Sequence, residues 1–147
     1  MKSSDFWKYI NLIDKDCLND MDEDGALEAL VAELSKLSEI EIFAFDDLLS
    51  KCLYDLDTKI HAGNSGDSGE SGDGFLYLRC YVIGCGDEYY AKCLSNPKKM
   101  PKSTDNWFES LLYVPQLAWS NVTGSDPSEY THQSSFSIET GSNESNW

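Results

Sequence analysis

The chain has 147 residues, of which 41% are hydrophobic and 12% aromatic, so it can build one domain with a buried core and is not wholly disordered. Its 26 acidic and 11 basic residues give a formal net charge of −15, which disfavours nucleic acid and anionic membranes as direct partners and favours a basic protein. The sequence shows no apolar run long enough to span a membrane and no signal-peptide core in its first residues, which predicts a cytoplasmic protein.

Three helices are predicted in the first part of the chain. Ser4 or Asp5 can cap the first helix, and residues 22–24 offer caps for the second. Ser38 and Glu41 form a predicted capping box at the start of the third and longest helix, because each side chain can bond the backbone N–H of the other residue. The apolar residues at helical spacing are Phe6, Trp7, Ile10 and Ile13, then Leu27, Leu30, Val31 and Leu34, then Ile40, Phe43, Leu48, Leu49, Cys52, Leu53 and Leu56.

The middle of the chain is interrupted by residues 63–74, GNSGDSGESGDG, in which glycine recurs every third residue. This composition predicts a flexible acidic loop. The apolar segment from Phe75 to Ile83 then predicts a helix, with a strand as the alternative. A short helix is predicted from Asp87 to Leu94, and another from residue 106 to residue 122, ending at Gly124. Pro115 should kink or split that last helix.

Residues 125–147 are rich in Ser, Thr, Asn and Gly, which predicts a loose polar tail. Within this tail, residues 135–138 alternate polar and apolar side chains and can form one short edge strand. The predicted fold is therefore all-α: a single-domain bundle of five to six helices over residues 1–124, with a glycine-rich acidic loop, followed by an irregular C-terminal tail over residues 125–147.

The segment from Asp20 to Gly25 matches the first half of a calcium-binding EF-hand loop. Acidic residues occupy its first, third and fifth positions, and glycine occupies the sixth. The twelfth position should supply a bidentate glutamate, but here it is Val31. We therefore interpret the segment as an acidic loop that caps a helix, and we predict no metal site.

The residues available for catalysis are few. The five cysteines are an odd number without a CxxC pair, which predicts buried reduced thiols rather than a disulfide framework or a zinc site. The only histidines, His61 and His132, flank low-complexity stretches and are expected to be solvated. No phosphate-binding glycine motif is present. We therefore predict no enzyme activity, no catalytic residues and no cofactor.

Four segments resemble a bacterial family catalogued as domain of unknown function 4240. They are FWKYI at 6–10, LSKLSEIEIFAF at 34–45, RCYVIGCGDEYYAKCLSNP at 79–97 and ESLLYVPQLAWSNVTG at 109–124. The resemblance implies a helical fold without an assigned catalytic activity, and some members resemble immunity genes of polymorphic or contact-dependent toxin systems. The chain departs from the family in its glycine run and at Pro115, where the family has alanine.

The first functional hypothesis is an immunity protein of a contact-dependent growth inhibition or polymorphic toxin system. It would bind and neutralise the C-terminal domain of a cognate toxin, expected to be a basic nuclease. The second hypothesis is a non-catalytic regulatory or adaptor domain that binds a basic protein, and the third is a hydrolase that uses Cys85 or His61. The acidity also fits a role in solubility alone.

Three acidic stretches are candidate partner-binding sites, and each of them can equally be ordinary solvated surface. The tyrosines of the third stretch are suited to act as anchors in an interface. The candidates are Asp20, Asp22, Glu23 and Asp24, then Asp67, Glu70 and Asp73, then Asp87, Glu88, Tyr89 and Tyr90.

Overall fold

The computed structural model describes residues 1–147 and contains eight α-helices, five short 3₁₀ turns and no β-strand. The α-helices are α1 (Ser3–Ile10), α2 (Lys15–Asn19), α3 (Glu23–Leu34), α4 (Glu39–Asp55), α5 (Lys59–Gly63), α6 (Gly72–Gly84), α7 (Asp87–Ser95) and α8 (Val114–Thr123). The 3₁₀ turns are η1 (Gly66–Glu70), η2 (Pro97–Lys99), η3 (Glu109–Tyr113), η4 (Pro127–Glu129) and η5 (Glu144–Asn146). The all-α prediction is confirmed. The number of helices is higher than predicted because α2 and α5 have only five residues each, too few to show an apolar period.

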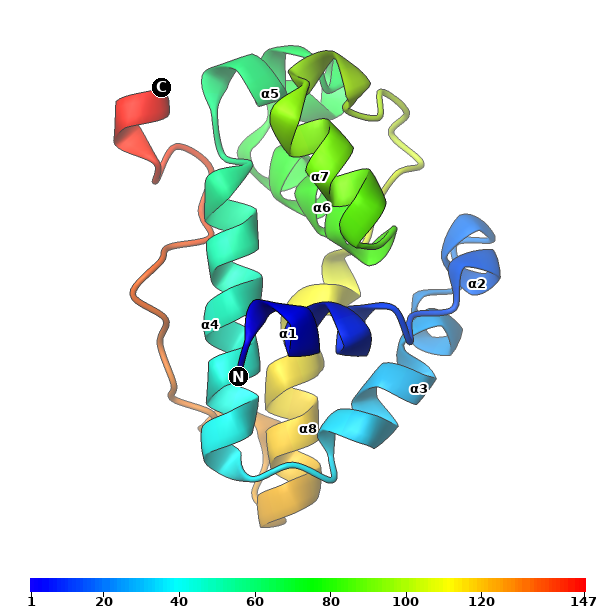
Figure 1. Cartoon of the computed structure of the whole chain (residues 1–147), viewed down its shortest axis with the longest axis vertical. Coiled ribbons are helices and arrows are strands. Elements are labelled where there is room, and N and C mark those ends of the chain that lie inside the picture. Colours follow the sequence, from blue (N-terminus) through cyan, green and yellow to red (C-terminus); the bar gives the residue numbers. More distant parts are fainter.

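Helix α4 runs through most of the molecule and organises the other elements (Figure 1). In one half, α8 packs against α4 and α3 packs against α8, while α1 crosses over this layer and contacts both α3 and α4. In the other half, α5, α6 and α7 gather around the C-terminal end of α4. None of these helices has both the length and the apolar composition needed to cross a membrane.

The predicted capping box at the start of α4 is confirmed. The Ser38 hydroxyl accepts the backbone N–H of Glu41 at 3.3 Å, and the Glu41 carboxylate accepts the backbone N–H of Ser38 at 3.0 Å. The predicted caps of α1 are wrong, because α1 already begins at Ser3 and its N-cap, Lys2, makes no side-chain bond.

The buried face of α4 matches the sequence prediction only in part. Leu49, Leu53 and Leu56 are buried as predicted. Ile42 and Phe45 are also buried, and the Phe45 ring lies 5.1 Å from the ring of Phe6 on α1. Ile40 is instead 78% exposed, and the other predicted residues are only partly buried. Each fully buried large apolar side chain contributes about 1.5–3 kcal/mol, so this face stabilises the fold strongly.

The glycine-rich segment is not a flexible loop, contrary to the prediction. It ends α5, forms the whole of η1 and begins α6, whose first turn is capped by the Ser71 hydroxyl. A Cβ atom at Gly69 would overlap the backbone carbonyl oxygen of Ala62. Glycine is needed here because turns of the chain pack directly against each other.

The helical segments of the second half form largely as predicted. The segment from Phe75 to Ile83 is helical, as part of α6, and α7 begins at Asp87. The last predicted helix begins at Glu109, not at residue 106, because residues 106–108 are not helical. Pro115 divides it into η3 and α8 and lies in the first turn of α8, where its missing N–H leaves no hydrogen bond unmade. Gly124 ends α8 in a left-handed conformation with φ of 76°.

Residues 125–147 form an ordered segment, which we call the C-terminal strap, rather than a loose tail. The strap follows the outer side of α4 upward in Figure 1, and no part of residues 135–138 forms a strand. The Tyr130 hydroxyl donates to Asp46 at 2.8 Å, and the Phe136 ring lies 5.3 Å from the Tyr54 ring. The prediction failed because the strap gains its order from α4, not from its own composition.

The far end of the strap is held by two buried charged residues. The Asp57 carboxylate accepts the backbone N–H groups of Gly141 and Asn143 at 3.0 and 3.1 Å, and the indole N–H of Trp147 at 3.0 Å. Arg79, which is fully buried, donates to the backbone carbonyl oxygens of Leu53 and Ile138 at 2.8 and 3.1 Å. These bonds connect the strap to α4 and α6.

Candidate functional site

A hollow of the surface lies between α3 and the segment formed by η3 and α8. It has a volume of about 790 Å³. We call it the α3–α8 groove, and its lining residues are Asp24, Gly25, Leu27, Glu28, Val31, Ala32, Ser110, Tyr113, Gln116, Leu117 and Asn121. A second hollow of about 490 Å³ lies on the other side of α3 and shares Gly25, Glu28 and Ala32 with the groove. The outer face of α3 therefore stands as a ridge between two hollows.

The sequence of α3 explains why its outer face carries small side chains. Leu27, Leu30 and Leu34 point into the core, so the opposite side of the helix carries Gly25, Ala29 and Ala32 at positions i, i+4 and i+7, among other residues. Small side chains at these positions leave the hollows open on both sides of the ridge.

The first turn of α3 is capped by a side chain that lies close to Gly25. The Asp22 carboxylate caps the helix by accepting the backbone N–H of Gly25 at 3.0 Å, which confirms a predicted cap. A Cβ atom at Gly25 would overlap that carboxylate.

The two walls of the groove are joined near both of its ends by hydrogen bonds. At one end, the backbone N–H of Ser110 donates to the Glu23 carboxylate at 3.1 Å. At the other end, the Asn121 side-chain amide donates to the Ser35 hydroxyl at 3.0 Å. These bonds fix the spacing of the walls, so the groove is formed in the unbound chain.

Apolar and aromatic side chains reach the solvent from the α8 wall. Leu117 is 40% exposed and Tyr113 is 43% exposed. The Tyr113 hydroxyl donates to the Glu109 carboxylate at 3.0 Å, and this bond raises the pKa of Tyr113. The ring of Tyr113 is therefore held in place beside the groove.

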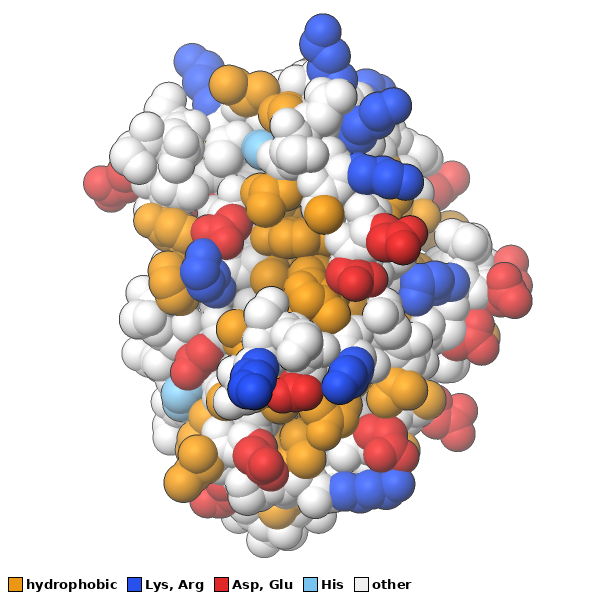
Figure 2. All heavy atoms as spheres, in the orientation of Figure 1, with side chains coloured by type: hydrophobic (Ala, Val, Ile, Leu, Met, Phe, Trp, Pro, Cys, Tyr) orange, Lys and Arg blue, Asp and Glu red, His pale blue; other side chains and the backbone are white.

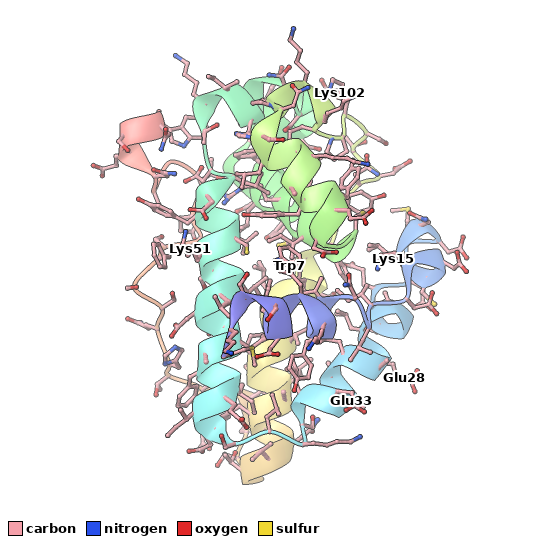
Figure 3. The ribbon with its side chains drawn as sticks, viewed as in Figure 1. Trp7, Lys15, Glu28, Glu33, Lys51 and Lys102 are labelled. Carbon is pink, nitrogen blue, oxygen red and sulfur yellow. The ribbon has the colours of Figure 1, made fainter.

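The lining of the groove is acidic. Asp24 and Glu28 are both exposed and contribute carboxylates to it. Five of the ten lysines lie around α5, α7 and η2, at the upper end of the face drawn in Figure 2, and the other five are spread over the rest of the molecule. Figure 3 places Glu28 and Glu33 on α3 and Lys102 near that upper end, away from α3. The lysines of this end are Lys59, Lys92, Lys98, Lys99 and Lys102.

Comparison with known proteins identifies the family. The model of the family described as "Protein of unknown function (DUF4240)" matches residues 1–121. The chain belongs to this family. No curated protein and no solved structure matches the chain. The family match includes every residue that lines the α3–α8 groove and leaves out the whole C-terminal strap.

Of the three predicted acidic stretches, only the first lies at the groove of this DUF4240 protein. Asp24 lines it directly, and Glu23 joins its walls through the bond to Ser110. Asp22 is occupied as the cap of α3, and Asp20 is exposed at the end of α2.

The other two stretches lie on separate elements outside the groove. Asp67 and Glu70 are exposed on η1, and Asp73 is exposed in the first turn of α6. Asp87 and Glu88 are exposed in the first turn of α7.

The tyrosines of the third stretch are less accessible than predicted. Tyr89 is half-buried, and burial raises its pKa. Tyr90 is buried: its hydroxyl donates to the backbone carbonyl oxygen of Cys52 at 2.9 Å, and its ring lies 5.1 Å from the Trp7 ring. Tyr90 is therefore not available as an interface anchor, because its aromatic ring packs in the core.

Sequence reasoning also missed most of the groove. Glu28, Ala32, Tyr113 and Leu117 were not predicted as site residues. The only local signal was the spacing of small residues on α3, and that pattern also occurs on helices with an ordinary exposed face.

The thiols and histidines take structural positions. All five cysteines are free, and burial raises the pKa of each thiol, that of Cys85 included. His61 is buried, not solvated as predicted, and its ring nitrogens lie 2.7 Å from the Thr58 hydroxyl and 3.0 Å from the backbone carbonyl oxygen of Cys93. His132 stacks on the Phe43 ring with centroids 4.5 Å apart. No three His, Cys, Asp or Glu side chains lie close enough together to hold a metal ion.

Proposed function

We propose that this DUF4240 member is a non-catalytic binding protein that captures a cationic protein at the α3–α8 groove. The observation that supports this proposal is a preformed groove with exposed apolar side chains on one wall and two exposed carboxylates, Asp24 and Glu28, in its lining.

The two kinds of surface have different roles in binding. Exposed apolar and aromatic residues, Leu117 and Tyr113 here, provide affinity when a partner covers them. Carboxylates around them select a partner of opposite charge and accelerate association, because the field of a chain with net charge −15 attracts cations from a distance.

The more specific form of this proposal is an immunity protein of a contact-dependent or polymorphic toxin system, acting in the cytoplasm. Its partner would be the C-terminal domain of a cognate toxin. A nuclease fits the charge argument, because the cleft that binds phosphate is cationic. Close charge pairs in a nuclease–inhibitor complex couple by about 1.5–7 kcal/mol each, so a few carboxylates can dominate the affinity.

The alternative within the same class is a regulatory or adaptor domain whose basic partner is not a toxin. Both forms use the same groove. They differ in whether the chain protects a cell from the protein that it binds.

The test is co-expression of the chain with the protein encoded by the neighbouring upstream gene, followed by co-purification and a growth assay. We expect a stable complex whose affinity falls as the salt concentration rises, because exposed charge pairs are screened. Growth rescue by the chain supports the immunity form, and a complex without rescue supports the adaptor form. A complex that is insensitive to salt and to neutralisation of Asp24 and Glu28 would refute the charge argument.

A further inference from the structure

The geometry of the α3–α8 groove points to one kind of occupant, and we infer that it is an amphipathic α-helix with a basic margin. This inference rests on the proposed function and specifies the part of the partner that enters the groove.

The first argument is the backbone of the occupant. The groove is walled by helices, whose backbone groups are already bonded, and the chain has no strand edge to pair with. An extended segment against the apolar part of the groove would lose water from its N–H and C=O groups without finding enough partners. A helix bonds its own backbone groups, so it can bury an apolar face there.

The second argument is the shape of the site. Helix α3 has 12 residues, which corresponds to a length of about 18 Å. The small residues Gly25 and Ala32 in the groove lining permit a helix to approach α3 closely, at an axial separation near the lower end of the usual range of about 8–10 Å. Leu117 and Tyr113 would then contact the apolar face of the same helix from the α8 wall.

The third argument is the spacing of charge. Asp24 and Glu28 are four residues apart on α3, so they lie on one side of that helix about one turn apart. Neither residue has a salt bridge within the chain. Lys or Arg residues at positions i and i+4 of an adjacent helix match this spacing. A second copy of this chain is disfavoured as the occupant, because two such acidic faces repel each other.

The test uses synthetic peptides of about 15 residues whose binding is followed by fluorescence anisotropy at roughly 50 mM and 500 mM NaCl. The first peptide places leucines along one helical face and lysines at i and i+4 beside them. The second peptide has the same composition in an order without a helical stripe. The third peptide has the sequence of the first with its lysines replaced by glutamate. We expect the first peptide to bind at least about tenfold more tightly than either of the others, which is 1.4 kcal/mol.

Two pairs of substitutions in the protein locate the site. Asp24→Asn with Glu28→Gln should weaken binding of the first peptide about tenfold at low salt. Asp67→Asn with Glu70→Gln removes the same charge from exposed positions on η1 and should change binding less than about twofold.

A third substitution tests the shape of the groove. Ala32→Trp fills the groove and should abolish binding of the first peptide. If that variant does not fold, Leu117→Ala, which removes an exposed apolar side chain from the groove, should weaken the binding instead.

The outcomes separate this inference from the proposed function. Equal binding of the striped and unstriped peptides would overturn the helical occupant, and so would equal effects of the two charge-removing pairs. If no peptide binds but the chain still forms a salt-sensitive complex with the upstream protein, the inference fails and the proposed function stands. If neither forms a complex, both fail.

Discussion

Removing the buried charge that holds the C-terminal strap should destabilise the fold substantially. The substitution Asp57→Asn keeps the shape of the side chain but not its charge. The native carboxylate accepts three N–H groups from the strap. An amide accepts through its single oxygen only, so its NH₂ group would face donors that it cannot bond.

The expected cost combines two effects. Hydrogen bonds to a charged group contribute about 1.5–3 kcal/mol each, but the last residues of the strap can detach and bond water instead, which limits this loss. Arg79 cannot detach. Burial lowers the pKa of its guanidinium, and the charge of Asp57 is the largest effect in the opposite direction. Asp57 forms no ion pair with Arg79, so losing its charge removes only part of the compensation for that buried guanidinium. Together with the weakened bonds to the strap, we expect a total loss of about 3 kcal/mol.

Urea unfolding at pH 7, followed by circular dichroism, measures this loss. With a urea m-value of about 2 kcal/mol/M, the midpoint should fall by about 1.5 M. The control is Asp55→Asn, which removes the same charge from a more exposed pair with Lys51 and should cost less than about 1 kcal/mol. Equal midpoints for the two variants would refute the role assigned to Asp57.

Further predictions concern the helix cap, the glycine segment and the thiols. Ser38→Ala should destabilise the fold by about 1 kcal/mol in the same urea assay, because it removes half of the capping box. Gly69→Ala should cost more than about 2 kcal/mol, since its Cβ atom would overlap a carbonyl oxygen of α5. Gly63→Ala meets nothing within 4 Å and should lower the melting temperature little or not at all; equal effects of the two would mean that the segment is a flexible loop. Burial raises the pKa of Cys52 to about 11 and that of Cys80 to about 12, so neither thiol should react with a thiol-specific reagent at pH 8 until the chain unfolds. The pKa of each thiol is higher in the folded than in the unfolded chain. The contribution of the two thiols to the free energy of unfolding is therefore present below about pH 8.5 and is lost as the pH rises toward 11–12.

The features that the sequence predicted correctly depend on neighbouring residues. The capping box of Ser38 and Glu41, the split at Pro115 and the helix end at Gly124 each follow from groups within a few residues of each other. The register of α4 was harder to predict. Ile40 and Ile42 are both isoleucines near the start of the helix, and only packing against the other helices decides which of them is buried.

The features that were missed depend on residues far apart in the sequence. The strap is polar, and its order comes from Asp57 and Arg79, which lie more than 55 residues before their strap partners. The glycine segment is ordered because η1 packs on α5 and α6. The groove requires α3 to meet α8, and its two walls are joined by residues separated by 86 and 87 positions. Composition and periodicity carry no information about such pairings.

The net charge alone could not locate a binding surface, because many carboxylates already bond groups of the chain itself. A partner cannot recruit these carboxylates without cost to the fold. They include Asp14, Asp22 and Glu41 at helix starts, Asp46 and Asp47 under the strap, and Asp57 at its end.

Asp24 and Glu28 lie at the groove without an ion pair in the chain, so they can bond a partner without weakening the fold. The electrostatic field of the whole chain accelerates association of the partner, whereas these two residues bond the bound partner and slow its dissociation. Stopped-flow measurements with the striped peptide should therefore separate the two effects. Removing two charges at Asp67 and Glu70 should slow association only slightly, whereas removing them at Asp24 and Glu28 should also speed dissociation about tenfold. Equal dissociation rates for the two variants would mean that the groove carboxylates contribute only to the long-range field.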